Sequence, residues 1–284
     1  MKSEKHDPPK DSSEIITWQL GNLQCSVFNA GSFRSDGGAG MGVFPKALWE
    51  KQITPDSLNR IELATNLILV KTEQFNLLVD TGIGYYSPKK LEKIYQPEPS
   101  RLLEHLQRCG CNREDLDYII LTHLHHDHIG GIIFKENHVE ELMFPQAKHI
   151  IQKREWETAN SPDELNQAAY QFNKPLTLLQ NSPNLMLIDG NYDLSPEITI
   201  YAEGGHSVGS QIVRIESESQ LCYYPGDIIP HIFHMNLAVT SAYDIARQQT
   251  FAAKKIILQE LEEKKGYLIF NHQPEKKLIK FPLS

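Results

Sequence analysis

The stretch LDYIILTHLHHDHIGG, residues 116–131, decides the fold prediction for this chain. Its first part, residues 116–121, is a short apolar run that predicts a buried strand. The strand leads directly into a His-x-His-x-Asp-His pattern, which comprises His123, His125, Asp127 and His128. Neutral imidazole and carboxylate groups are ligands for zinc and comparable divalent ions. The sequence therefore predicts a metal site at the end of a buried strand.

The spacing within the pattern indicates room for two ions. Side chains alternate along an extended chain, so His123 and His125 face the same side. Asp127 and His128 follow after the chain turns, and they face a neighbouring position. An exposed histidine-rich loop is the alternative interpretation, but the pattern follows a buried strand and precedes Gly130-Gly131, which permit a tight turn. A chance match is expected on the order of once per thousand sequences of this composition.

Four further segments complete an ordered set around this pattern. Val79-Asp80-Thr81-Gly82 ends an apolar strand before it, and Gly205-His206-Ser207-Val208-Gly209-Ser210 follows it. Pro225-Gly226-Asp227 comes after another apolar strand, and Asn271-His272 closes a late one. Together with the histidine pattern, these segments resemble the metallo-β-lactamase superfamily, with serine where the family's GHTxGS segment has threonine. The resemblance runs from residue 79 to residue 272 and covers most of the chain.

This resemblance implies a fold, a cofactor and a set of ligands. The fold is of the α/β class, an αβ/βα four-layer sandwich of two mixed β-sheets flanked by helices. The cofactor is a pair of divalent metal ions, expected to be zinc. Asp80 takes a structural role, whereas Asp127 and Asp227 are assigned to catalysis. The implied ligands are His123, His125 and His206 for the first ion, Asp127, His128 and His272 for the second, and Asp227 as a bridge between them.

Within the superfamily, the chain looks closest to the branch of lactonases and organophosphate hydrolases, which includes quorum-quenching N-acyl-homoserine lactonases. Residues 43–46, 59–61 and 237–244 carry this finer resemblance. It implies a hydrolase in which two metal ions activate water to open a lactone or to cleave an ester-like bond. The alternatives are a glyoxalase II-like thioesterase or a phosphotriesterase of the same fold. An alternative of another class is a non-catalytic metal-binding sensor protein.

Several residues outside the ligand set are candidates for a substrate pocket. His231 and His234 follow Asp227 in an expected active-site loop, where a pocket role and a plain surface role are both open. A helical insertion near the pocket is expected over residues 161–180. Its Tyr170 and Phe172 either form an apolar wall for an acyl chain or pack the insertion onto the body of the protein.

A tyrosine that assists the reaction is harder to assign. Some lactonases of the family place a tyrosine three residues after the bridging aspartate, where this chain has Pro230. Tyr223, Tyr224 and Tyr243 are the remaining candidates. His126 occupies the variable position of the histidine pattern, and we expect it to point at the pocket or at solvent rather than at a metal ion.

The rest of the chain predicts one catalytic domain over residues 15–284, after a disordered N-terminal tail over residues 1–14. Ser161 is the expected N-cap of the inserted helix, with Glu164 completing a capping box. Strands are expected over 15–30, 65–71, 75–79, 147–152 and 267–270, and strand pairs over 185–203 and 210–225. A glycine-rich loop is expected over 31–42, and helices over 100–108 and 241–264.

Composition narrows the partners and the compartment. The chain of 284 residues has a net charge of −8, with 28 basic and 36 acidic residues and no basic stripe. We therefore expect a small-molecule lactone or ester as substrate and no nucleic acid. Four cysteines without a CxxC pair fit a reducing cytoplasm, and no apolar run is long enough to span a membrane. The chain is expected to be a monomer or a homodimer.

Overall fold

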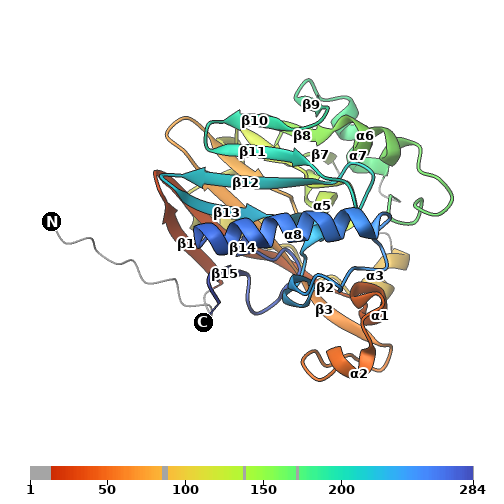
Figure 1. The fold of residues 1–284 in the computed structure, drawn as a ribbon. Helices are drawn as coiled ribbons and strands as arrows, with labels where there is room; N and C mark the ends of the chain where they lie inside the picture. Colours follow the sequence, from red (N-terminus) through yellow and green to blue (C-terminus); the bar gives the residue numbers. More distant parts are fainter. Residues whose placement is uncertain (1–13, 85–88, 137–138, 171–172, 284) are drawn as a thin grey trace.

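The structure is a computed structural model that describes residues 14–84, 89–136, 139–170 and 173–283. Its strands form two large mixed sheets and a hairpin (Figure 1). The first sheet has the order β1 (Ile15–Leu20), β2 (Leu23–Asp36), β3 (Arg60–Lys71), β4 (Asn76–Val79), β5 (Tyr118–Ile120), β8 (Lys148–Gln152) and β9 (Leu185–Ile188). The second has the order β10 (Tyr192–Ser195), β11 (Ile198–Ala202), β12 (Gln211–Ser217), β13 (Gln220–Tyr224), β14 (Tyr267–Ile269) and β15 (Leu278–Lys280). The hairpin pairs β6 (Ile133–Glu136) with β7 (Val139–Leu142).

The helices lie outside the two sheets. Helix α8 (Arg247–Lys264) lies along the outer face of the second sheet (Figure 1). Helices α4 (Leu102–Arg108), α6 (Lys153–Asn160) and α7 (Asn173–Gln180) pack on the outer face of the first. The shorter helices are α1 (Gly37–Met41), α2 (Lys46–Trp49), α3 (Lys89–Tyr95) and α5 (His126–Ile129). This is the predicted four-layer α/β arrangement.

The burial of β3 explains why the layers form. Leu67 and Leu69 point into the core under the helices, whereas Ile68 and Val70 point into the core between the two sheets. Because alternate side chains enter different cores, residues 64–70 are buried without a break, as is typical of a strand covered on both faces. The edge strand β1 instead alternates buried and partly exposed side chains.

Several predicted boundaries differ from the structure. Residues 31–36 are not part of a loop, because they continue β2 and pair with residues 60–64 of β3; only 37–41 leave the sheet, as α1. Ser161 is the C-cap of α6 rather than an N-cap, and the helical part of the insertion is α7, so no capping box begins at Ser161. Helix α8 begins at Arg247, since residues 241–246 form turns.

Of the predicted N-terminal tail, residues 1–13 lie outside the described residues. Strand β1 begins at Ile15, as the pattern predicts. Glu14, between them, is described. Its carboxylate forms ion pairs with Arg101 and Arg108, at 3.4 and 2.6 Å.

The motif residues follow the carboxyl ends of five strands. Asp80 follows β4, His123 follows β5, and His206 follows β11. Asp227 follows β13, and His272 follows β14. The pairs β4–β5 and β13–β14 are parallel, so their carboxyl ends open at the same edge, where α/β folds place their ligands.

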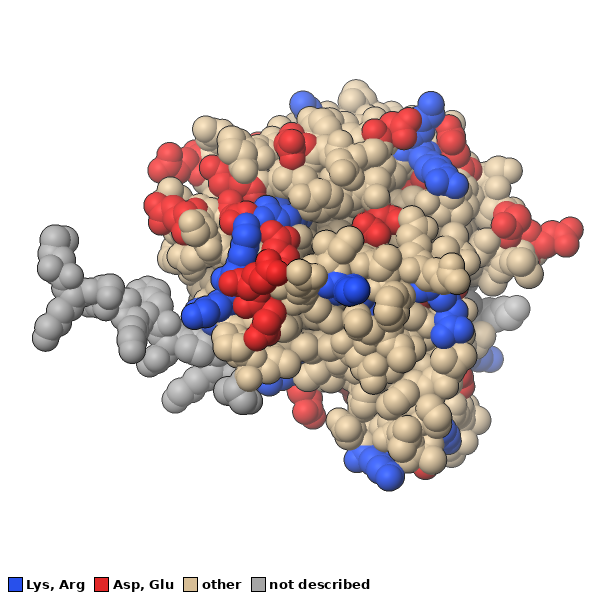
Figure 2. Space-filling model, in the orientation of Figure 1, with Lys and Arg blue, Asp and Glu red and all other residues tan. Residues whose placement is uncertain are grey.

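Charge on the surface is mixed. On the face drawn in Figure 2, basic side chains lie singly or beside acidic ones. Ion pairs join Arg214 with Glu260, and Lys264 with Glu216 and Glu260. Among the described residues, no helix is both long and apolar enough to cross a lipid bilayer.

Candidate metal centre

The seven predicted ligands converge on one small volume. Their ligand atoms form three overlapping groups, and within each group all of these atoms lie within 4.8 Å of one another. The groups are His123, His125 and His206; His123, His128 and Asp227; and Asp127, His128 and His272. The first and third groups are those predicted for two separate ions, and the second joins them through Asp227.

The first group is a cluster of three imidazole rings. The ring of His123 lies 4.4 Å from that of His125 and 4.8 Å from that of His206, measured between centroids. His206 Nε2 lies 3.2 Å from His125 Nδ1, so different nitrogens of the two rings face a common point. Three nitrogens that converge in this way are a donor set suited to a zinc-like ion.

Asp227 lies between the two groups. One of its carboxylate oxygens is 3.2 Å from His206 Nε2, and the other is 3.3 Å from His128 Nε2 and 3.1 Å from His272 Nε2. Asp127 completes the second group, with Oδ2 3.3 Å from His272 Nε2. An oxygen turned to each side is the arrangement that a bridging carboxylate requires.

The polar atoms at the centre fit divalent ions. His123 Nε2 is buried without a hydrogen-bond partner, which is costly unless another ligand satisfies it. Burial and the neighbouring histidines hold the pKa of His123 and of His125 well below the ordinary value, which favours the neutral, metal-binding form. Burial opposes ionisation of Asp227, but His272, His206 and His128 hold its pKa well below the ordinary value.

In three of these histidines, the Nδ1 atom on the far side of the ring also has a hydrogen-bond partner. His128 Nδ1 lies 2.8 Å from Asp80 Oδ2, and His272 Nδ1 donates to the carbonyl of Ala64 at 2.7 Å. His206 Nδ1 lies 2.9 Å from Oδ1 of Asp244, whose side chain is almost fully buried. Such partners fix the orientation of a ligating ring and raise its basicity.

Asp80 stabilises the loop that carries the histidine pattern. It accepts hydrogen bonds from the backbone N–H of Thr122 at 2.7 Å and from the hydroxyl of Tyr224 at 3.2 Å. Its backbone has φ = 59°, a left-handed conformation that aspartate tolerates better than most residues. The side chain thereby reaches across from β4 to the start of the ligand loop, in the structural position expected for it.

Asp244 provides a direct test of this outer support. We expect Asp244→Asn to weaken binding of the ion held by His206 by about 10–100-fold, since a neutral amide orients and polarises the ring less. Metal titration against a chromophoric chelator measures the effect. Asp189→Asn changes an exposed aspartate and should leave both affinities unchanged. Equal affinities in Asp244→Asn and the unsubstituted protein would contradict this role.

Comparison with known proteins agrees with this geometry. The model of the metallo-beta-lactamase superfamily matches residues 60–260, which is more than half of the chain. The chain belongs to this superfamily. A relative from Bacillus sp., named N-acyl homoserine lactonase, is 30% identical over 177 residues, which are 58% of this chain and 63% of that protein. A relative of the same name from Bacillus cereus is 29% identical over 63% of this chain and 68% of that protein.

Solved structures of the superfamily extend the match to nearly the whole chain. A probable metal-dependent hydrolase from Staphylococcus aureus is 29% identical, with a TM-score of 0.85 over 93% of this chain and 94% of that one. AidC, described as a dizinc quorum-quenching lactonase in complex with a homoserine product, is 24% identical, with a TM-score of 0.73 over 96% of each chain. The latter likeness establishes the shared superfamily fold. The chain covers less than two thirds of the Bacillus sp. relative.

The predicted pocket residues differ in their surroundings. His231 and His234 are both buried, so the plain surface role is wrong. His231 stacks on Phe233 with ring centroids 5.5 Å apart, and burial, with His272 nearby, lowers the pKa of its ring to about 3. His234 Nε2 lies 3.2 Å from the carbonyl oxygen of Gly40 and so contacts α1.

The two aromatic residues of the insertion have different outcomes. Tyr170 is buried in the core under the helices, and its ring centroid lies 5.1 Å from that of His125. Its hydroxyl donates to Glu155 Oε1 at 2.9 Å. Tyr170 therefore packs the insertion onto the body while contacting a predicted ligand. Phe172 lies outside the described residues.

The candidate tyrosines are separated by their contacts. The Tyr223 hydroxyl donates a hydrogen bond to Glu260 of α8, on the outer side of the second sheet. The Tyr224 hydroxyl donates a hydrogen bond to Asp80. Tyr243 is 48% exposed. Partial burial, and then the nearby charge of Asp127, raise the pKa of its hydroxyl. Burial, with Tyr243 and Asp127 nearby, raises the pKa of Tyr95 to about 12. Tyr95, on α3, lies outside every motif and was missed by the sequence prediction.

A rim of aromatic side chains borders the second metal group. The Tyr95 ring is 4.8 Å from the ring of His126, so His126 faces this rim, as expected. The ring of Phe33 is 6.2 Å from that of Tyr95 and 5.7 Å from that of His272. Phe33 was also missed, because it lies in the stretch predicted as a loop.

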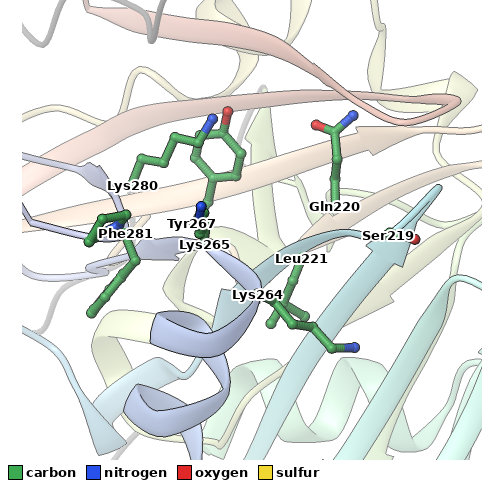
Figure 3. A pocket seen from close by; sticks show the side chains of 9 residues that line it. Ser219, Gln220, Leu221, Lys264, Lys265, Tyr267, Lys280 and Phe281 are labelled. Carbon is green, nitrogen blue, oxygen red and sulfur yellow. The ribbon is translucent and has the colours of Figure 1, made fainter.

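A pocket at the other end of β13 is a separate feature. Figure 3 shows that it is lined by Gln220 at the start of this strand, by Tyr267 and by lysines. Asp227 follows the opposite end of the strand, five residues long, which places the pocket about 15 Å or more from the metal groups. Two of its lysines contact other groups, since Lys264 pairs with Glu216 and Lys280 lies 5.0 Å from the ring centroid of Tyr267.

Proposed function

We propose that this protein is a metal-dependent lactonase that opens the ring of N-acyl-homoserine lactones with the help of two divalent ions, most simply zinc. One observation carries the proposal: two groups of ligands share Asp227 between them. The names of the Bacillus relatives and of AidC support the substrate class. The lactone activity of this chain is inferred from that similarity together with the site.

The two aspartates of the site would have distinct roles in such a reaction. When bound, the two ions supply an activated water and stabilise the charge that develops on a carbonyl oxygen. Asp127 and Asp227 orient the histidines and balance the positive charge of the ions. Asp127 is also placed so that its carboxylate could accept the proton that the attacking water loses and pass that proton to the leaving alkoxide.

The aromatic rim fits an acyl-lactone substrate. The buried ring of Phe33 packs behind this part of the site, 5.7 Å from the ring of His272. Tyr95 and Tyr243 are more exposed, and both present an aromatic ring and a hydroxyl group near Asp127. A neutral lactone with an acyl amide needs both kinds of contact, because its chain is apolar and its carbonyl oxygens accept hydrogen bonds. With Pro230 in the position where some lactonases have tyrosine, these two hydroxyls are our candidates for contacting the substrate.

A substrate panel tests the proposal. Zinc-loaded protein is incubated with short- and long-chain N-acyl-homoserine lactones, aryl esters, a phosphotriester and S-lactoylglutathione, and the products are followed by mass spectrometry. We expect ring opening of the lactones that disappears when a chelator removes the metal. Asp127→Asn should lower kcat/KM at least about 100-fold, because the proton transfer and one ligand are weakened. Asp189→Asn should retain full activity.

Other outcomes would redirect the assignment. Faster turnover of S-lactoylglutathione or of the phosphotriester than of any lactone would favour the thioesterase or phosphotriesterase alternative. Two bound ions with no turnover of the whole panel would favour the metal-binding sensor. Hydrolysis that survives complete metal removal would overturn the two-metal proposal.

We also propose that the protein acts in the cytoplasm. All four cysteines are free thiols, in keeping with a reducing cytoplasm. Whether the chain acts as a monomer or a homodimer stays a prediction, which sedimentation analysis of the zinc-loaded protein answers directly.

A further inference from the structure

A buried carboxylate outside every motif connects three parts of the metal centre. Glu155, in the first turn of α6, is only 1% exposed. Its Oε1 accepts hydrogen bonds from the Leu124 backbone N–H at 3.0 Å and from the Tyr170 hydroxyl at 2.9 Å. Its Oε2 accepts from the Ser207 hydroxyl at 2.7 Å and from the Gly209 backbone N–H at 3.0 Å.

These four donors belong to the segments that carry the first metal group. Leu124 lies between His123 and His125, and Ser207 directly follows His206. Tyr170 belongs to the insertion and contacts the ring of His125. One carboxylate therefore ties the two ligand loops and the insertion to one another, although it touches no predicted ligand side chain itself.

The surroundings of Glu155 allow little adjustment. A side chain on Gly209 would collide with the backbone of Glu155 and come within 2.8 Å of its Cα, so the start of α6 lies directly against the loop of His206. Two of the four donors are backbone N–H groups, which cannot turn to become acceptors. A buried, charged acceptor is stable only when donors of this kind surround it.

The same contacts define the role of Ser207. The segment Gly205–Gly209 has the Gly-x-Ser-x-Gly spacing typical of a serine hydrolase nucleophile. Here the serine is buried, its hydroxyl donates to Glu155, and the segment leads into β12 rather than into a helix. Ser207 is thus a donor to the carboxylate and not a nucleophile.

We propose that Glu155 is the positioning residue of the first metal site, and that it sets the spacing of His123, His125 and His206 through the loops that carry them. This inference rests on the proposed two-metal function. The expected consequence is selective: the ion at the first group depends on Glu155, whereas the ion at Asp127, His128 and His272 does not. The insertion contributes through Tyr170, which supplies one of the four donors.

Glu155→Gln tests the proposal. The amide keeps one carbonyl oxygen, so one pair of donors loses its acceptor, and a backbone N–H then faces the amide NH2 group. We expect the first-site ion to bind about 10–100-fold more weakly, with the second site changed less than about threefold. Stepwise dissociation constants for Zn²⁺ and Co²⁺ are measured by competition with a chromophoric chelator, and cobalt absorption reports the ligand geometry. His206→Ala identifies which binding step belongs to the first site.

Two matched variants separate positioning from general destabilisation. Glu157→Gln changes an exposed glutamate on the same helix, 4.0 Å from Lys153, and should leave both constants unchanged. Tyr170→Phe removes only one donor and should weaken the first site less than Glu155→Gln does. Equal weakening of both sites, or a lower melting temperature with unchanged metal constants, would overturn the positioning role. An unsubstituted protein that binds fewer than two ions would instead overturn the two-metal function.

Discussion

Asp227→Ala is expected to remove the two-metal site and lower kcat/KM for lactone opening by about 10³-fold or more, equivalent to about 4 kcal/mol of activation free energy. Its two oxygens lie within 3.3 Å of three histidine nitrogens from both groups. Without this carboxylate, the positive charges of two adjacent ions are no longer balanced between them. Metal analysis should therefore give one ion or fewer per chain, and turnover should fall with it.

The size of this effect distinguishes a bridge from an ordinary ligand. Asp227 also accepts a hydrogen bond from Asn271, the residue before His272, so the change should disturb the second group in particular. Asp227→Asn keeps the shape of the side chain and should restore only part of the metal content, because it lacks the charge. Full occupancy by two ions in Asp227→Ala would show that the bridging interpretation is wrong.

The seven candidate ligands could be proposed from the sequence because the resemblance to the superfamily assigns them and because they follow strand ends. Metal ligands come from few residue types, and each of them here lies in a short motif after an apolar run. The strands in turn follow from alternating or continuous apolar patterns. The structure brings all seven predicted side chains together, although the segments that carry them lie as far apart as residues 123 and 272.

The supporting residues were not predictable in the same way. Glu155 lies three residues after β8, with no motif around it, and its partners lie 15 to 54 positions away in the sequence. Only the packing of α6 against the loop of His206 reveals its role. Phe33 and Tyr95 were missed for a related reason: nothing local marks them, and their relation to His126 and His272 depends on how β2 and α3 pack.

The stretch 31–42 shows how a local rule fails. Its glycines predicted a loop, since glycine weakens both strands and helices. Pairing with β3 outweighs this preference, and the register shift between Asn29 and Ser32 accommodates the chain at Gly31. This pairing places the buried Phe33 beside the rings of Tyr95 and His272. Tertiary pairing therefore placed a residue that packs behind the site where composition indicated only a loop.

Gly130 and Gly131 lie in the tight turn predicted for them, a 3-10 helix over Gly130–Ile132. The turn itself does not require glycine at residue 130, because Gly130 has φ = −60°, which any residue can adopt. What excludes a side chain is close approach. A Cβ on Gly130 would collide with the carbonyl oxygen of Ile83, and one on Gly131 with that of Thr81. The loop behind Asp80 and the loop behind His128 are thus in backbone contact.

Gly130→Ala should consequently be among the most damaging substitutions of a small residue in this chain. The obstructing atoms are backbone atoms, so no side-chain rotation relieves the collision, and we expect a loss of about 3 kcal/mol in the free energy of unfolding. Urea unfolding of the metal-free protein measures this loss without involving the ions. Gly40→Ala is the matched control, because a Cβ there meets only the end of Ile61 at 3.9 Å and alanine favours the helical backbone of α1. A loss below about 1 kcal/mol in Gly130→Ala would show that the two loops can separate, and that other contacts, including those of Asp80 and Glu155, hold the ligand loop in position.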